Sequence, residues 1–397
     1  MENGFSLLYE DSKSKLYRRA TVKNATLNAG QILNLGEMSL NKFDAAIMKE
    51  LANIGTEYSD GTRTLNESEL DEVKNTQTLR PTDSSLKSAA GIGHYENLTS
   101  LDCSWTDLTS LNVSGLPMLK ELNGSLCSNL TSLDVSGLTN LETLKIPQCN
   151  NLTSLNVSGL TNLKTLYISQ CAKLTSLDVS KLTNLETLDC FSTGLTAIDV
   201  NECTNLVTLN ISGCTHLTEL NVSELSKLTS LDCSGCSSLS NLNYGEKNTA
   251  LEIFDCSSCN MTELNLSKMT RLNRLMCSDN QLSELNLRGL TMLAVLDCSI
   301  NNLSTLNLDD QVMLTRLSCN QNRLSELDIT QTQISSTGDL FCGRQYYNEE
   351  TYDYESVDVY VTSDQYEELQ NLRLNGHNSG VRLSMKPDST EMIGAEF

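Results

Sequence analysis

The sequence predicts a right-handed solenoid of parallel β-strands, and three features of the chain support this prediction. A unit of 21 to 23 residues recurs eleven times between Leu98 and Gln333. Each unit contains two similar halves, and in each half apolar residues fall at the first, fourth and sixth positions. A fixed period of this size indicates a stack in which no repeat can bury its apolar face alone. Function is therefore expected on an extended surface rather than in one compact pocket.

The first half of each unit follows the pattern L-x-x-L-x-C/I-x-x-C/N, which matches the leucine-rich repeat template. Its alternation at the fourth and sixth positions predicts a short strand that faces a flat core. The fifth position points outward, and its residue varies along the chain: Asp102, Asn123, Lys145, Tyr167, Asp189, Asn210, Asp232, Asp255, Met276, Asp297 and Ser318. A variable outward column favours binding, so we expect the first-half strands to line a concave binding face.

The second half of each unit also predicts a short strand, because its apolar residues alternate in the same way. Its fifth position is Asn or Asp in all eleven copies: Asn112, Asp134, Asn156, Asp178, Asp199, Asn221, Asn243, Asn265, Asn286, Asn307 and Asp328. A column this uniform is typical of a structural role. We expect a ladder of side chains that runs along the stack.

The fifteen cysteines follow the repeat rather than a disulfide framework. Apart from Cys203 and Cys342, they occupy the sixth position (Cys103, Cys190, Cys233, Cys256, Cys277, Cys298, Cys319) or the ninth position (Cys127, Cys149, Cys171, Cys214, Cys236, Cys259) of the first half. Equivalent side chains of stacked strands lie about 4.8 Å apart, whereas a disulfide needs Cβ atoms about 3.8 Å apart. We therefore expect free thiols that fill the core. The alternative is a redox or metal ladder.

The ninth position divides the array into two parts. The last three repeats carry Asn280, Asn301 and Asn322 there, and an asparagine can bond the backbone where the chain turns away from the strand. Six earlier repeats carry a cysteine, which bonds only weakly. This difference predicts two sub-arrays with different turn geometry.

The region before the array is predicted to form an N-terminal segment and a cap. Residues 1–40 are polar and mixed, and residues 41–97 contain an apolar face of helical period that runs from Phe43 to Ile54. A polar connector then leads into the array from residue 74. A helical cap is expected because the open end of a solenoid exposes its core.

A second helix is predicted in the same cap, because Asn66 and Glu69 resemble a capping pair for a helix that runs through Val73. The resulting helix-loop-helix resembles a degenerate EF-hand. However, Tyr58 stands at the first ligand position and Arg63 stands where a glycine is required. The pattern favours a structural cap over a calcium site.

Residues 334–397 are predicted to form a small α+β C-terminal cap. Leu340–Gly343 resembles one final, altered strand of the array. The segment Tyr346–Glu355 is acidic and rich in tyrosine, and we expect a loop there. The remaining predicted elements are two strands and the helix between them, at Val357–Val361, Val381–Leu383 and Asp364–Leu372.

The charge of the chain narrows the class of partner. The 28 basic and 50 acidic residues give a formal net charge of −22, and phosphate binding needs lysine and arginine, so nucleic acid is not expected as a partner. No apolar run is long enough for a transmembrane segment. The N-terminal residues Met1–Ser6 lack the features of a signal peptide, so an exported protein would carry its signal outside this sequence.

The repeat register selects candidate binding residues on the first-half strands. Exposed aromatic side chains favour contacts with proteins or sugars, and the candidates are Trp105, Tyr167 and Phe191. A stripe of carboxylates is predicted beside them, with positive charge at its end: Asp189, Asp232, Asp255, Asp297, Arg274 and Arg316. The alternatives are edge packing for the aromatic residues and ordinary solvated strand positions for the aspartates. No cofactor and no metal site is predicted.

The residues quoted above resemble a known group. The pattern L-x-x-L-x-C-S-x-N-x-L, with cysteines stacked at its sixth position, is similar to the cysteine-ladder repeats of internalin J-type surface proteins. The segment 130–144, LTSLDVSGLTNLETL, is similar to leucine-rich repeat surface proteins of Bacteroidetes. The resemblance covers residues 98–333. It implies an exported, internalin-like bacterial protein at the cell surface or outside the cell, used in adhesion to a host or to a neighbouring cell.

The sequence leaves three functions open. The first is a non-enzymatic adhesin that binds a protein or glycan on the concave face. The second is an enzyme or effector in which the repeats recognise a substrate, but Cys342 has only His377 nearby in sequence as a possible base. The third is a structural component of a surface assembly. The sequence favours the adhesin and does not fix the oligomeric state.

Overall fold

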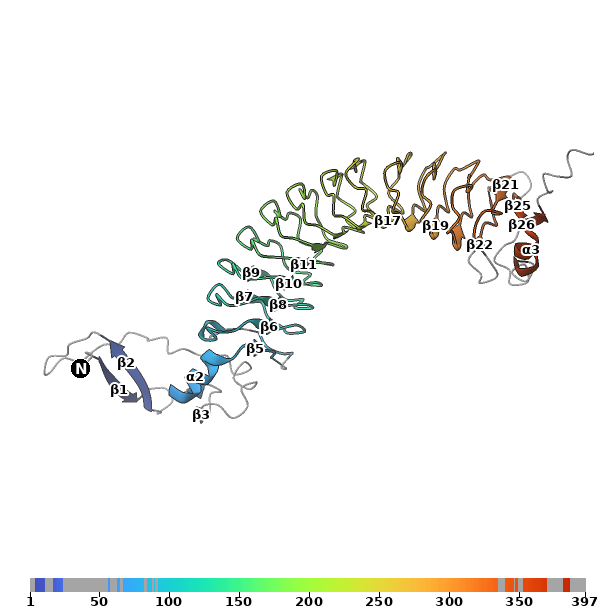
Figure 1. Cartoon of the computed structure of the whole chain (residues 1–397). Helices are drawn as coiled ribbons and strands as arrows, with labels where there is room; N and C mark the ends of the chain where they lie inside the picture. Colours follow the sequence, from blue (N-terminus) through green and yellow to red (C-terminus); the bar gives the residue numbers. More distant parts are fainter. Residues whose placement is uncertain are drawn as a thin grey trace, which may run out of the picture.

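The computed structural model shows an elongated, curved solenoid (Figure 1). The structure describes residues 4–10, 17–23, 56–57, 63–64, 67–81, 84–87, 89, 92–334, 340–345, 347–348, 353–369 and 381–385. Within these residues, no helix is both long and apolar enough to cross a membrane.

One parallel sheet of thirteen strands runs along the inner, concave side of the curve (Figure 1). Eleven of its strands are the predicted first-half strands: β6 (Ser100–Asp102), β8 (Glu121–Asn123), β10 (Thr143–Lys145), β11 (Thr165–Tyr167), β12 (Thr187–Asp189), β13 (Thr208–Asn210), β15 (Ser230–Asp232), β17 (Ile253–Asp255), β18 (Arg274–Met276), β19 (Val295–Asp297) and β20 (Arg316–Ser318). Equivalent residues pair directly, as in Leu188 with Leu209. The prediction of a parallel β-solenoid is therefore confirmed.

The sheet extends by one strand at each end. β5 (Thr78–Leu79) pairs with β6, although the polar composition of the connector predicts no regular structure there. β22 (Leu340–Phe341) pairs with β20, where the altered strand is expected. The stack therefore has about thirteen turns rather than eleven, because partial turns continue the pairing beyond the recognisable repeats.

The second halves form strands in only five of the eleven repeats, so the expectation of a strand in every second half is wrong. The five strands are β7 (Ser110–Asn112), β9 (Ser132–Asp134), β14 (Glu219–Asn221), β16 (Asn241–Asn243) and β21 (Glu326–Asp328). The alternating sequence is the same in the other six, but a curved stack spreads its outer side further than its inner side. Backbone pairing needs neighbours about 4.8 Å apart, and the concave sheet holds that spacing.

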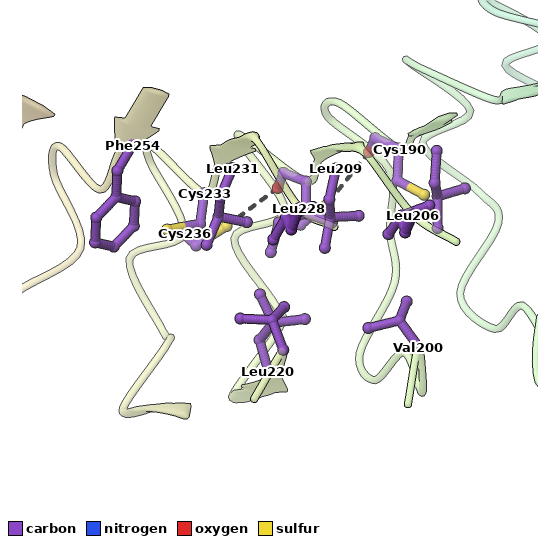
Figure 2. Close-up of a cluster of buried hydrophobic side chains, with 14 of the residues drawn as sticks. Cys190, Val200, Leu206, Leu209, Leu220, Leu228, Leu231, Cys233, Cys236 and Phe254 are labelled. Carbon is purple, nitrogen blue, oxygen red and sulfur yellow. Dashed lines mark hydrogen bonds between the residues drawn. The ribbon is translucent and has the colours of Figure 1, made fainter. Parts of the chain in front are cut away.

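The core lies between the two sides and consists of stacked leucines, valines, isoleucines and cysteines. Figure 2 shows part of it, from Cys190 to Phe254, with the side chains of successive turns in contact. All fifteen cysteines are free and buried, which confirms the interpretation of the thiols as core residues. The first-half leucines, such as Leu188, are fully enclosed.

Several short elements precede the array. They are the antiparallel pair β1 (Gly4–Glu10) and β2 (Tyr17–Lys23), the antiparallel pair β3 (Thr56–Glu57) and β4 (Arg63–Thr64), α2 (Glu67–Asn75) and the single 3-10 turn η1 (Ile92–His94). α2 begins directly after Asn66, as the capping pair predicts. The helix expected between Phe43 and Ile54 lies outside the described residues, as does most of the EF-hand-like loop.

A parallel three-stranded sheet follows the last repeat. β21 pairs with β25 (Val357–Val361), and β25 pairs with β26 (Val381–Met385). α3 (Ser363–Leu369) lies between β25 and β26 in the sequence. Its Gln365 side chain donates hydrogen bonds to the carbonyls of Ile329 at 3.0 Å and Thr332 at 3.2 Å. The C-terminal unit is thereby held against the outer side of the last repeat.

The acidic, tyrosine-rich segment, for which the composition predicts a loop, contains a short antiparallel pair. β23 (Tyr347–Asn348) pairs with β24 (Asp353–Tyr354). The tyrosines of this segment have high strand propensity, which the acidic composition conceals.

Candidate binding surface on the concave sheet

The four predicted aspartates lie on the concave sheet, each at the end of its strand: Asp189 on β12, Asp232 on β15, Asp255 on β17 and Asp297 on β19. Each is partly buried. The Oδ1 atom of each carboxylate accepts a hydrogen bond from the backbone N–H two residues later, in every case at 3.0 Å. These bonds are Asx turns, which fix the chain as it leaves the strand. The aspartates therefore have a structural role in addition to any binding role.

Two of these carboxylates have altered acidity. Partial burial raises the pKa of Asp189, and the nearby charge of Asp232 raises it further. Burial also raises the pKa of Asp255, with contributions from Asp232 and Asp297. The hydrogen bonds of the Asx turns lower both pKa values but do not outweigh the burial. The concave sheet is thus a place where negative charge is crowded and poorly hydrated.

The aromatic candidates divide into a cluster and an isolated residue. Tyr167 pairs in register with Asp189, and the Nζ atom of Lys145 lies 5.8 Å from the centroid of the Tyr167 ring. Phe191 follows Asp189 by two residues and is 36% exposed. Trp105 lies in the first repeat and is 66% exposed. The structure therefore brings together Lys145, Tyr167, Asp189 and Phe191 but leaves Trp105 apart.

Of the two arginines predicted to end the acidic stripe, only Arg316 lies beyond its last aspartate, on the strand that follows Asp297. Arg274 begins β18, between the strands of Asp255 and Asp297, and Arg316 begins β20. Both stand at the third position of the repeat, one outward column away from the aspartates. Arg274 therefore interrupts the stripe, because the order of the strands in the sheet follows the order of the repeats.

The asparagines and aspartates of the second halves lie on the convex side and do not form the expected ladder along the stack. In ten of the eleven copies the Oδ1 atom accepts a hydrogen bond from the backbone N–H two residues later in the same repeat. The exception is Asn243. The column is uniform because each turn needs the same local bond, so its role is structural but local.

A left-handed residue stands at the eighth position of the first half in twelve successive turns, a feature that the repeat pattern does not predict. Ten of these residues are not glycine, with φ between 51° and 64°: Trp105, Leu126, Gln148, Gln170, Ser192, Ser258, Asp279, Ile300, Gln321 and Arg344. The two glycines are Gly213 and Gly235. The two glycines and Asp279 are the only sequence signals, since the other nine residues do not favour this conformation.

The ninth position joins each turn to the one before it. The Nδ2 atom of Asn301 donates to the carbonyl of Cys277 at 2.9 Å, and its Oδ1 atom accepts from the N–H of Leu282 at 3.0 Å. In the earlier repeats a thiol makes only the first of these bonds, as in Cys236 to the carbonyl of Ile211 at 3.1 Å. The two predicted sub-arrays therefore differ in the number of bonds at this turn.

The cysteines offer no reactive thiol at the sixth position. Burial raises the pKa of Cys342 to about 12 and holds the pKa of Cys277, Cys298 and Cys319 well above the ordinary value. Within the described ranges, no three His, Cys, Asp or Glu side chains are arranged to hold a metal ion.

No protein-family model matches the sequence, and no curated protein matches it. Solved structures do resemble the fold. The functional domain of InlJ from Listeria monocytogenes, described as including a cysteine ladder, has a TM-score of 0.55 and 27% identity over 76% of each chain. An internalin of the same species, InlF, has a TM-score of 0.46 and 20% identity over 83% of this chain and 92% of that chain.

A leucine-rich repeat protein of Leptospira interrogans has a TM-score of 0.38 and 19% identity, over 84% of this chain and all of that chain. The structural neighbours are thus internalins and leucine-rich repeat proteins. They do not test the expected Bacteroidetes origin. The buried thiols of this chain match the cysteine ladder of InlJ, and the array is a leucine-rich repeat solenoid with a cysteine ladder of its own.

Proposed function

We propose that this chain is a non-enzymatic binding protein of a bacterial cell surface, which holds a protein or glycan partner on its concave sheet. The observation that carries the proposal is the contrast between the two fifth-position columns. The convex column repeats Asn or Asp for a local turn, whereas the concave column changes from Lys145 to Tyr167 to Asp189 on successive strands. Asn and Asp in the concave column also make an Asx turn, so recognition is supported by the variation at positions such as Lys145 and Tyr167, whose side chains cannot make that turn.

The cluster of Lys145, Tyr167, Asp189 and Phe191 is the strongest candidate for the contact region. It combines two aromatic side chains with a cation and a carboxylate on three adjacent strands. Aromatic residues dominate the energy of many interfaces, since they bury a large area at a small entropic cost. Trp105 offers a second, separate contact.

The chemistry of the chain does not favour an enzyme. Cys342 is the candidate nucleophile, but its thiol is fully buried and its raised pKa keeps it protonated. A protonated, buried thiol is a poor nucleophile. The cell-surface location is supported by the resemblance to InlJ alone.

Binding to a panel of immobilised host extracellular proteins and to a glycan array tests the proposal. We expect at least one ligand whose binding is lost in the Tyr167→Ala/Phe191→Ala variant. Met118→Ala is the matched control, because Met118 is an exposed apolar residue outside the cluster. Silence across both panels, or ligands that bind equally to the aromatic variant, would overturn the proposal.

A further inference from the structure

The middle of the concave sheet exposes apolar side chains that no part of the described chain covers. The central concave surface is defined here as the outward face of residues 185–192, 206–213, 228–235 and 251–258, which contain β12, β13, β15 and β17. Phe191, Val207 and Ile253 on this surface are 36%, 37% and 41% exposed. Exposed apolar side chains gathered on one face of a rigid sheet mark an interaction site.

The same four segments contain no lysine and no arginine. They carry the carboxylates of Glu186, Asp189, Asp232 and Asp255, together with Glu252, which the Nη2 atom of Arg271 engages at 2.8 Å. Glu252 is therefore compensated. Within the described residues, none of the other four carboxylates forms an ion pair with a lysine or an arginine.

The pKa values of two aspartates show that negative charges lie close together on this surface. Asp189 and Asp255 have raised pKa values, and Asp232 contributes to both. A cationic group placed over Asp232 would therefore reduce the electrostatic repulsion among Asp189, Asp232 and Asp255. The surface offers both apolar area and negative charge. A complementary partner therefore carries apolar side chains interspersed with basic ones.

The size of the surface limits what fits. Four parallel strands about 4.8 Å apart span about 14 Å between the first and the last. An extended peptide advances about 3.3 Å per residue, so four or five residues cross the surface. Alternate side chains of an extended peptide point to the same side, so every second residue of such a segment faces the carboxylates and apolar side chains of the central concave surface.

We propose that the central concave surface docks an extended protein segment that carries lysine or arginine beside apolar side chains. This inference rests on the proposed function, because it assigns the class of partner to the same sheet. Phe191, Val207 and Ile253 contact the apolar side chains of the segment, and Glu186, Asp189 and Asp232 face its cations. A neutral glycan would leave the carboxylates without counter-charge.

The test uses two acetylated hexapeptides, one of alternating lysine and valine and one of alternating glutamate and valine, with binding measured by calorimetry. We expect the lysine peptide to bind and the glutamate peptide not to bind. Affinity for the lysine peptide should fall about fivefold or more between about 50 mM and about 300 mM salt.

Two triple variants separate this surface from the net negative charge of the whole chain. D189N/D232N/D255N removes three concave carboxylates, and Asn210 shows that asparagine makes the same Asx turn in this column, with 2.9 Å between Ser212 N and Asn210 Oδ1. D134N/D178N/D199N removes three convex carboxylates with the same change of charge. We expect about tenfold weaker binding in the first variant and less than about twofold in the second.

Each outcome decides between the claims. Equal losses in the two triple variants, or no loss in either, would overturn the docking of a basic segment on this surface. If a panel ligand depends on Tyr167 and Phe191 but is a glycan, or is insensitive to the concave triple variant, the inference fails and the proposed function stands. If the lysine peptide behaves as expected but no panel ligand depends on the aromatic cluster, the proposed function fails alone.

Discussion

The two sides of the array use the same residue for the same turn in different surroundings. On the convex side, Asp178 accepts the N–H of Ser180 at 3.0 Å, and on the concave side, Asp255 accepts the N–H of Ser257 at 3.0 Å. Hydrogen bonds lower the pKa of the exposed Asp178, whereas burial raises the pKa of Asp255. Local geometry is therefore not what distinguishes the two faces. Hydration and neighbouring charge distinguish them, and these follow from the closer packing of the concave strands.

The largest expected difference between the sides is in amide hydrogen exchange. The N–H of Thr187 donates to Lys164 at 2.9 Å and that of Cys190 donates to Asn210 at 2.7 Å, whereas Leu177 and Asp178 donate no backbone hydrogen bond within the described residues. We expect the concave amides to exchange about a thousandfold more slowly. Exchange read by NMR would measure it. Comparable protection on the two sides would show that convex pairing forms in solution.

The next difference is in the stability lost when a leucine is truncated. Leu188 on β12 is 0% exposed, and Leu177 in the preceding convex segment is 7% exposed. We expect Leu188→Ala to lower the free energy of unfolding by about 3–5 kcal/mol and Leu177→Ala by about 2–3 kcal/mol, because the open side relaxes more easily. Urea denaturation checks both variants. Equal losses would mean that the convex side packs as tightly as the concave side.

The carboxyl titrations should move in opposite directions on the two sides. The raised pKa of Asp255 favours the folded state below the ordinary pKa, and this contribution is lost as the pH rises through the raised value. The lowered pKa of Asp178 favours the folded state above the ordinary pKa, and that contribution is lost as the pH falls through the lowered value. Carbon-13 NMR titration should place Asp255 above and Asp178 below the ordinary range. If Asp255 and Asp178 titrate with the same midpoint, the two sides of the array do not differ in their electrostatic environment.

The smallest expected effect concerns the left-handed turn, which stands in every repeat of the concave half but only at Gly137 and Gly289 in the convex half. Ile300 has φ 54°, and this conformation is unfavourable for a β-branched residue. Ile300→Asn should raise the free energy of unfolding by about 1 kcal/mol, since asparagine tolerates the conformation. The opposite change is Gly213→Ile, whose Cβ atom would lie 2.7 Å from the Ser192 Oγ atom and should destabilise the fold. If urea denaturation shows the Ile300→Asn variant to be less stable than the parent, the backbone of Ile300 is not strained.

The concave strands could be predicted from the sequence because their alternation decides which side chains are buried. The same alternation at residues 154–156 predicts a strand that does not form, since pairing there depends on the distance to the next repeat, which no local pattern reports. The Asx turns carry a readable signal, Asn or Asp followed two residues later most often by serine. Their local nature is hidden because a uniform column also suggests a ladder.

The candidate site was only partly predictable for a related reason. The register identifies Tyr167, Asp189 and Phe191 as outward residues, and their proximity follows from neighbouring strands. The exposure of Val207 and Ile253 depends on the curvature of the sheet. The raised pKa values of Asp189 and Asp255 depend on the burial that neighbouring strands impose. Those properties arise from the packing of whole repeats and not from any one segment.

The uneven hydrogen bonding also gives the molecule a mechanical character. Thirteen strands joined on one side form a spine that resists stretching, while six of the eleven second halves have no strand to pair on the other side. The solenoid can bend by changing the spacing between repeats on the convex side, where most repeats are not joined by paired strands. The radius of the arc can therefore adjust without breaking the concave ladder, and the binding surface proposed on the concave sheet would keep its side chains in order against partners of different curvature.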